Sequence, residues 1–315
     1  MGEVSVVRYE AARASEWDEF VSRSKNGVFL FMRGYMDYHA DRFPDASLMF
    51  YDGGGRLVGL LPATSREAGV LASHAGLTFG GVVAGDSMKA ATMLGLFDAM
   101  LARLRAEGYA RLVYKAVPHI YHRAPAEEDL YALFRAGARL VRRDLSSTLD
   151  MTARLPFSKG RKYSIKLAAR HGVSVAESGD FETFMAIEER VLAERHGVRP
   201  VHTAAELRML AGRFPSNIRL YAASREGRML AGVVVYESER VAHAQYISAT
   251  DEGREVGATD MIVNTLVEGA YASRRFFDFG ISTERGGTHL NEGLAENKQG
   301  YGARAVVYDF YELEL

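Results

Sequence analysis

The chain contains no cysteine, and this absence removes several classes of site at once. Without a thiol there is no disulfide, no thiolate-bound metal and no cysteine nucleophile. Long apolar runs are missing as well, since no stretch approaches the roughly 18 continuous apolar residues of a membrane-spanning helix. The opening residues carry no apolar run of signal-peptide length, so we expect a cytoplasmic protein without a transmembrane segment.

The net charge is close to zero, because 39 basic side chains nearly balance 40 acidic ones and leave a formal charge of −1. Nothing in the overall charge therefore indicates DNA, RNA or a membrane surface as a partner. Apolar residues make up 48% of the 315 positions, which is enough for one large domain or two ordinary ones.

The two halves of the chain follow a similar plan. In each half the pattern predicts a β-hairpin, then a long helix, then a short aromatic strand. This repetition indicates the duplication of a whole domain, and we place the N-terminal domain at residues 1–150 and the C-terminal domain at residues 151–315. The predicted hairpins cover Leu48–Leu61 and Leu220–Tyr236, and the strands after the helices cover Leu112–Val117 and Phe276–Ile281.

The most informative stretch begins at Val241. Alternation over Val241–Ile247 predicts a strand, and apolar spacing over Ala258–Ala272 predicts a helix that leads to the strand Phe276–Ile281. A parallel β-α-β crossover is the simplest connection between them. The turn Asp251–Gly257, just before the helix, would offer free backbone N–H groups to an anion.

A basic segment precedes this unit. Residues Lys159–Arg170 are predicted to form a helix with Lys159, Lys162, Lys166 and Arg170 along one face. Such a face is either a solvated surface or a surface that meets an anionic ligand, and the sequence leaves both readings open.

Together these features resemble the FemABX-type branch of the GNAT superfamily, in the form of tandem-GNAT-domain acyltransferases. The likeness rests on the basic helix before Gly172, on the strand Phe277-Asp278-Phe279, and on Glu296–Gly302, which is similar to the Lys-x-x-Phe/Tyr-Gly signature of that branch. It covers essentially the whole chain. Arg254–Thr259 also comes close to the Arg/Gln-x-x-Gly-x-Gly/Ala loop that binds the pyrophosphate of acyl-CoA in GNAT enzymes, with Thr259 at the last position.

The resemblance implies an α/β (α+β) fold of two tandem GNAT-like domains, each a mixed, mostly antiparallel sheet flanked by helices. It implies an N-acyltransferase that forms an amide bond by passing an acyl or aminoacyl group to an amine of a small or cell-envelope precursor, such as a sugar nucleotide or a peptide. The donor would be a co-substrate, either acyl-CoA or aminoacyl-tRNA, with no permanently bound cofactor, and tRNA would be a partner only in the second case. A binding protein for an anionic sugar or peptide that has lost its activity is the alternative.

Attack by a neutral amine needs positioning, a proton acceptor and donors for the developing oxyanion. The resemblance points to Lys298 as the oxyanion stabiliser, although a solvated surface lysine is the alternative. Tyr301 is a candidate acid toward the leaving group, although an aromatic residue before a glycine is more often part of the core. Asp278 and Glu284 are candidates to accept the amine proton, although a capping or loop role is the more common one for such residues.

Further candidates fall into two groups. Those for binding the donor are Arg254, Gly257, Ala258 and Gln245. Those for binding the acceptor are His119, His122, Arg123, Lys162, His243, Asn291 and Glu292. No metal site is expected, because the paired histidines His119 and His122 have no third ligand at a suitable spacing.

Overall fold

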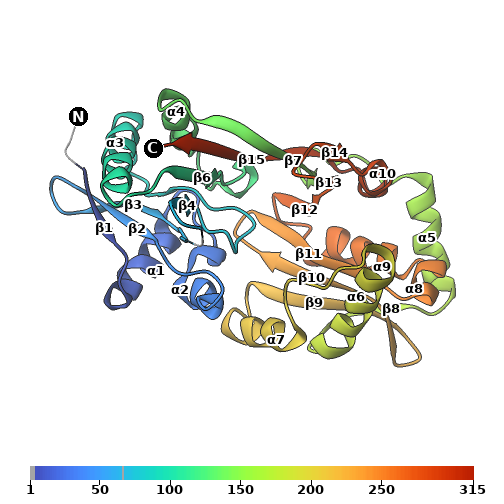
Figure 1. Ribbon diagram of the computed structural model, residues 1–315. Helices are drawn as coiled ribbons and strands as arrows, with labels where there is room; N and C mark the ends of the chain where they lie inside the picture. The colour runs from blue at the N-terminus through green and yellow to red at the C-terminus, as the bar shows by residue number, and fades with distance from the viewer. Residues whose placement is uncertain (1–3, 66) are drawn as a thin grey trace. The chain divides into compact units, whose positions relative to one another are not determined.

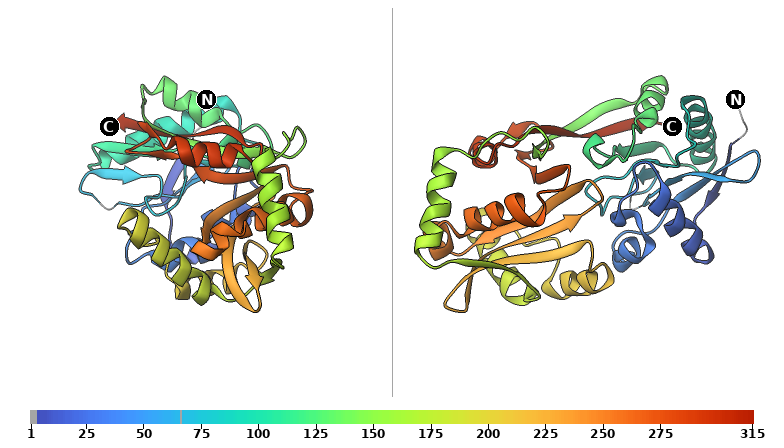
Figure 2. Two further views of the ribbon diagram at one scale, coloured as in Figure 1. Left: turned by 90° about the vertical axis from the view of Figure 1, so that its right-hand side faces the viewer. Right: turned by 180° about the vertical axis from the view of Figure 1, so that it is seen from behind.

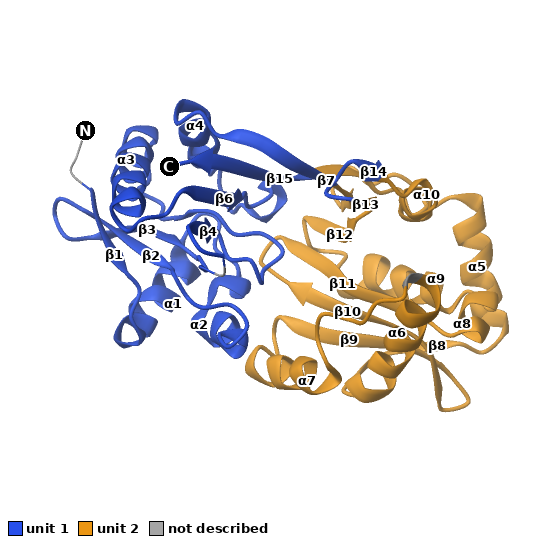
Figure 3. Ribbon diagram, viewed as in Figure 1, with its two compact units in different colours: residues 1–144, 284–289, 307–315 blue, residues 145–283, 290–306 orange. Residues whose placement is uncertain are grey.

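The computed structural model describes residues 4–65 and 67–315 and divides into two compact units (Figures 1 and 3). Unit 1 extends to Asp144 and also contains Glu284–His289 and Val307–Leu315. Unit 2 consists of Leu145–Thr283 and Leu290–Val306. The strands β7 (Arg139–Asp150) and β15 (Arg304–Glu314) contribute residues to both units. The boundary predicted at residue 150 lies at the end of β7, and the division into two evolutionary domains there stays a prediction.

Unit 1 contains two groups of paired strands around an apolar core. Its strands, besides the ends of β7 and β15, are β1 (Val4–Arg8), β2 (Leu48–Asp52), β3 (Leu57–Leu61), β4 (Val70–Ala72), β5 (Val83–Ala84) and β6 (Arg111–Lys115). Its helices are α1 (Ala14–Arg23), α2 (Arg33–Met36), α3 (Ala90–Ala106) and α4 (Glu128–Arg135). β1, β2, β3 and β5 pair in that order, and the hairpin predicted from the sequence is the β2–β3 pair. β6 pairs with β4 on one side and β15 on the other.

Unit 2 is a mixed sheet whose strands follow the order β7, β12, β11, β10, β9, β8. These strands are β8 (Ser174–Ser178), β9 (Ile218–Arg225), β10 (Arg228–Glu237), β11 (Val241–Ala249), β12 (Phe276–Ile281) and the end of β7. The helices are α5 (Lys159–Arg170), α6 (Phe181–His196), α7 (Ala204–Arg213), α8 (Asp251–Glu255), α9 (Ala258–Thr265) and α10 (Glu292–Gln299). The β11–β12 pair is parallel and its neighbours are antiparallel, so the predicted hairpin and crossover are confirmed.

Helices cover both faces of the unit 2 sheet. Val233 packs into the same apolar core as Ile262 of α9. The adjacent Gly232 points to the other face because side chains alternate along a strand, and a Cβ built there would lie 2.3 Å from Phe184 of α6. The right-hand view in Figure 2 shows the strands between orange and olive helices. The fold class predicted from the sequence, with mixed sheets flanked by helices, is therefore confirmed.

Strand β11 departs from regular pairing at two places that matter for the site. Its register with β10 passes from Tyr246 to Ala244, so Gln245 is the extra residue of a bulge within the strand that the alternation over Val241–Ile247 predicted. Its parallel register with β12 covers three pairs and ends at His243 and Asp278. Beyond that pair β11 and β12 separate.

The connection between these strands also differs from the sequence prediction. The predicted turn Asp251–Gly257 contains the short helix α8, because Thr250 caps it with a hydrogen bond from the Gly253 N–H (3.0 Å). The predicted helix Ala258–Ala272 continues as α9 only to Thr265, after which a π-helical turn covers Leu266–Ala270. In the part of the chain that is described, no helix has both the length and the apolar character needed to span a membrane.

Gly257 is required by the backbone, and this gives the first prediction. Its φ is +77°, and a Cβ there would lie 2.5 Å from the carbonyl oxygen of Ser164 on α5. Gly257→Ala should therefore lower the free energy of unfolding by about 2 kcal/mol or more, measured by urea unfolding. Gly212→Ala is the matched control, because a Cβ in that helix meets nothing within 4 Å, and it should raise stability by about 0.5–1 kcal/mol. Equal effects at the two positions would contradict this account.

Candidate functional site

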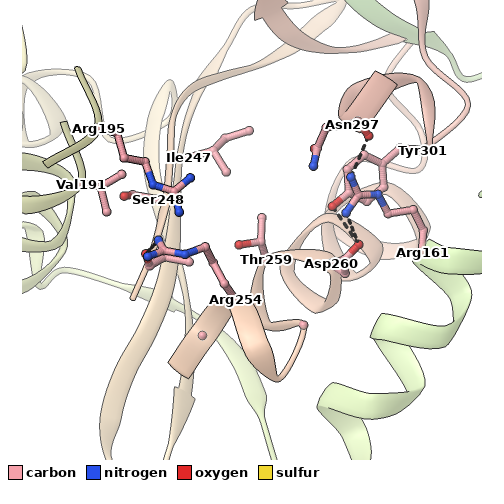
Figure 4. Close-up of a pocket in the computed structure, with 13 residues that line it drawn as sticks. Arg161, Val191, Arg195, Ile247, Ser248, Arg254, Thr259, Asp260, Asn297 and Tyr301 are labelled. Carbon is pink, nitrogen blue, oxygen red and sulfur yellow. Dashed lines mark hydrogen bonds and ion pairs between the residues drawn. The ribbon is translucent and has the colours of Figure 1, made fainter. Parts of the chain in front are cut away.

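A pocket of about 370 Å³ lies at the C-terminal end of β11 in unit 2 (Figure 4). Three arginines line it from three different helices: Arg161 from α5, Arg195 from α6 and Arg254 from α8. Figure 4 shows Arg195 and Arg254 on one side, Arg161 beside Tyr301 on the other, and Thr259 between them. The remaining lining residues are Val191, Ile247, Ser248, Ala249, Gly253, Gly257, Asp260 and Asn297.

The start of α9 adds to the anion-binding character of this pocket. Gly257 precedes the helix in a left-handed conformation and makes no side-chain cap, while Thr259 in the first turn lines the pocket. The first N–H groups of a helix have no intrahelical partner, and the helix dipole is positive at this end. Arginines beside free amides suit a ligand that carries phosphate.

Two carboxylates at the start of α8 are paired with arginines. Asp251 pairs with Arg254, and Glu252 pairs with Arg225 and Arg228 of the neighbouring hairpin. These ion pairs offset the repulsion that the carboxylates would otherwise exert on a phosphate.

Asp260, Arg161 and Tyr301 form a hydrogen-bonded cluster on one wall of the pocket. Arg161 donates to Asp260 (2.9 Å) and to the carbonyl of Asn297 (2.9 Å), and its guanidinium lies 4.3 Å from the centre of the Tyr301 ring. The Tyr301 hydroxyl donates to Asp260 (3.0 Å), and its ring stacks on Phe279. Burial, with the nearby Asp260 carboxylate, raises the pKa of Tyr301, so this hydroxyl remains protonated at neutral pH. Its role as an acid stays a prediction.

A second cluster surrounds Asp278 where β11 and β12 separate. This carboxylate is fully buried and accepts hydrogen bonds from Ser146 (2.6 Å) and Thr148 (2.7 Å) of β7 and from His243 Nδ1 of β11 (2.7 Å). Burial alone would raise the pKa of Asp278, but the hydrogen bond from His243 and those from Ser146 and Thr148 hold this pKa below its usual value. Asp278 is therefore an ionised carboxylate inside the sheet.

Lys298 is buried on α10, with 7% of its surface exposed, and is not the solvated lysine that the sequence allowed. Its Nζ donates to the carbonyls of Gly280 (2.9 Å) and Ile281 (2.7 Å), just beyond Asp278 on β12. Burial lowers the pKa of Lys298 to about 8, and the nearby charge of Asp278 partly opposes this shift. These contacts hold the end of β12 in place, and a role in stabilising an oxyanion stays a prediction.

The other predicted residues of unit 2 have varied positions. Ala258 is buried in the core, Gln245 occupies the bulge of β11, and Lys162 is exposed on the outer face of α5. Asn291 caps α10 by accepting a hydrogen bond from the Leu294 N–H (3.0 Å), and Glu292 is exposed in the first turn of that helix.

Four predicted residues belong to unit 1 instead. His119 is exposed, while His122 is buried with its Nε2 3.0 Å from the carbonyl oxygen of Val117. Arg123 donates to the carbonyl of Ser22, and Glu284 is exposed.

Of the predicted site residues, the structure brings Arg254, Gly257 and Tyr301 together at the pocket. His243 and Asp278 meet in the second cluster.

Some residues of both clusters were not predicted from the sequence. Arg161 reaches the pocket because it lies on the inner face of α5 with Ile165 and Ala168. This face is opposite the exposed lysines of the same helix. The helical spacing of these three residues is a signal that could have revealed it. Ser146 and Thr148 alternate on β7 and so share a face toward Asp278, but no local pattern links them to a residue so far along the chain.

A family model matches the part of the chain that contains the three pocket arginines, His243 and Asp278. Residues 158–286 match the family model described as an acetyltransferase (GNAT) domain. This part of the chain is therefore similar to a GNAT domain. A search of curated proteins by sequence finds no match. Within the residues that the structure describes, no group of three or more His, Cys, Asp or Glu side chains is arranged to hold a metal ion.

Solved structures show the same fold over the full length of this chain. FemX aligns with a TM-score of 0.70 at 12% identity, covering 99% of this chain and 97% of that one. L-PGS from Bacillus licheniformis aligns with a TM-score of 0.62 at 12% identity, covering 100% and 93%. A tandem GNAT protein from the clavulanic acid biosynthesis pathway aligns with a TM-score of 0.50 at 13% identity, covering 99% and 98%. The predicted resemblance to FemABX-like tandem GNAT proteins is confirmed.

The lowered pKa of Lys298 gives a prediction for stability. The unfolded chain binds this proton more tightly, so between pH 8 and pH 10.5 it holds more protons than the folded chain, and stability rises with pH. The free energy of unfolding of the wild type relative to Lys298→Met should therefore increase by about 2 to 3 kcal/mol across this window. Unfolding in urea at several pH values measures the difference, and Lys166→Met at an exposed position controls for the loss of a lysine. A difference that stays flat or falls with pH would refute the prediction.

Proposed function

We propose that this protein is an N-acyltransferase that forms an amide bond on an amine of a small or cell-envelope precursor. The observation that supports this proposal is the pocket of Arg161, Arg195 and Arg254 at the start of α9, at one end of the separation between β11 and β12. A phosphate-bearing donor fits the arginines and the free amides of α9. Its acyl group would then extend along β11 toward the point where the strands meet.

The chemistry asked of such a site is modest. A neutral amine attacks the acyl carbonyl, a proton leaves the amine, and the thiol or ribose hydroxyl of the donor departs with a proton. Positioning, proton transfer and stabilisation of the oxyanion account for catalysis, and no covalent enzyme intermediate is needed. The absence of cysteine from the chain is therefore compatible with this reaction.

Acyl-CoA and aminoacyl-tRNA both carry a phosphate and an acyl group. The basic outer face of α5 would contact only the second, so it provides a test that distinguishes the two donors. An acyl-CoA would need only the pocket. An aminoacyl-tRNA would extend further, and the outer face of α5 presents Lys159, Lys162, Lys166 and Arg170, all exposed, on the helix that supplies Arg161 to the pocket. Phosphate contacts of this kind depend on local charge, so the near-zero net charge of the chain does not weigh against a polynucleotide.

Calorimetric titration with acetyl-CoA and CoA tests the thioester donor. If acyl-CoA is the donor, both ligands bind saturably, and Arg195→Glu weakens binding by about tenfold or more because it places a carboxylate against the phosphates. Arg208→Glu is the matched control, since this exposed arginine of α7 changes the net charge equally and lies outside the pocket lining. No heat at millimolar CoA would reject the thioester donor.

Fluorescence anisotropy with an acceptor-stem minihelix RNA tests the second donor. If the donor is aminoacyl-tRNA, the triple variant Lys159→Gln, Lys162→Gln and Lys166→Gln weakens binding and reduces the slope of log K against log salt by roughly 2 to 3. The same variant should leave CoA binding unchanged. Unchanged RNA binding would show that the outer face of α5 is a solvated surface.

Turnover decides between an enzyme and an inactive binding protein. Release of CoA from acetyl-CoA can be followed with a thiol reagent, with ethanolamine, glucosamine and lysine as amine probes, and the protein adds no thiol background because it has no cysteine. Minihelix RNA charged with alanine serves as the second donor. Binding of a donor without transfer to any amine would favour a protein that has kept its ligand and lost its activity.

A further inference from the structure

Asp278 and His243 differ in solvent exposure, and this difference indicates different roles for the two residues. Asp278 was a sequence candidate for accepting the amine proton, yet it is 0% exposed. Oδ1 accepts from Ser146 and Thr148, and Oδ2 accepts from His243. A carboxylate enclosed in this way reaches no substrate, and a proton placed on it would break hydrogen bonds that hold three strands together.

His243 occupies the accessible position of the same cluster. Its side chain keeps 13% of its surface exposed, and its Nδ1 donates to Asp278 over 2.7 Å. An ionised carboxylate can only accept a hydrogen bond, so Nδ1 of His243 holds a hydrogen, and in the neutral ring the other nitrogen, Nε2, carries the lone pair that can accept a proton. The ring lies against Gly280, where an added Cβ would be 3.4 Å from Cε1 of His243, so little side-chain bulk covers this edge of the imidazole.

The position of His243 along β11 matches that of a reacting group. It forms the last parallel pair with β12, and the arginine pocket begins at Ile247 and extends to Ala249 on the same strand. At the rise of a strand, these pocket residues lie roughly 13 to 20 Å from His243. A donor that places its phosphate among the arginines would therefore need an arm of this length to bring its acyl carbonyl to His243.

We propose that His243 is the catalytic base of the transfer and that Asp278 is the residue that positions it. This inference rests on the proposed N-acyltransferase function. The amine nitrogen forms a bond to the acyl carbon as Nε2 of His243 takes one N–H proton. The bond from the acyl carbon to the donor sulfur or oxygen then breaks, and the imidazolium returns its proton to that leaving atom.

Ser146 and Thr148 complete the positioning. They come from β7, on the side of β12 away from β11, with Thr148 directly opposite Asp278 in the register. Their two hydrogen bonds fix the rotation of the carboxylate, so that Oδ2 faces His243. Asp278 is thus held by hydrogen bonds from the strands on both sides of it, β7 and β11.

Histidine NMR tests the positioning without any need for turnover. Long-range proton–nitrogen correlation on the resting protein at pH 7.5 should show His243 as the Nδ1–H tautomer, with a low-field Nδ1 proton that Asp278→Asn removes. An Nε2–H tautomer, or a doubly protonated ring at this pH, would overturn the proposal. The control His202→Gln changes a histidine that contacts β11 through Tyr246, and it should leave the His243 signals in place.

Kinetics tests the base role itself, with the donor and amine probe that the wild-type protein uses. His243→Gln should lower kcat by about 10² to 10⁴-fold while the Kd of the donor stays within about threefold. Added imidazole should restore part of the rate to His243→Gly. His202→Gln should retain the wild-type rate.

The outcomes separate the two proposals. Full transfer by His243→Gln would overturn the base role and leave the acyltransferase function standing. No transfer by the wild-type protein with either donor would overturn the proposed function, and the base role with it. If Asp278→Asn fails to fold, His243→Gln and the imidazole rescue still decide the question.

Discussion

A single buried carboxylate sets the geometry on which both parts of the site depend. Asp278 is ionised within the sheet, and a buried charge is tolerated only when its hydrogen-bonding capacity is met. Partners from β7 and β11 meet that need, so the three strands are joined at this point. The parallel register of β11 with β12 ends here, and the separation of the two strands begins at a fixed place.

The rest of unit 2 arranges charge around that separation. At its open end, arginines from α5, α6 and α8 lie beside the start of α9. Ser164 of α5 closely approaches Gly257, the residue that precedes α9, and so restricts how α9 begins. At its closed end, Lys298 binds the carbonyls that follow Asp278 and holds β12 in place. The two ends are linked by β11, whose bulge at Gln245 changes which side chains face each layer. A donor with phosphate at one end and a reactive carbonyl at the other suits this arrangement.

The sequence predicted the fold better than the site, for reasons that particular residues make clear. The hairpins, the basic helix and the β11–β12 crossover follow from local periodicity, and the structure confirms them. Asp278, His243 and Tyr301 were singled out as residue types, yet their environments depend on contacts between distant segments, such as Ser146 with Asp278. Lys298 was placed by its motif, but its burial follows from how α10 packs. The pocket role of Arg161 was not predicted, because the lysines on the opposite face of α5 dominate the charge pattern of that helix.

The most direct test of this account is a crystal structure of the protein with a bound donor analogue. Coenzyme A and a stable 3′-aminoacylamino-adenosine nucleotide are suitable ligands, because each has a phosphate at a defined distance from its reactive end. The account predicts phosphate density against Arg195 and Arg254, with the thiol or aminoacyl end directed along β11 to Nε2 of His243. Density for either ligand elsewhere in the chain, or a reactive end pointing away from His243, would contradict it.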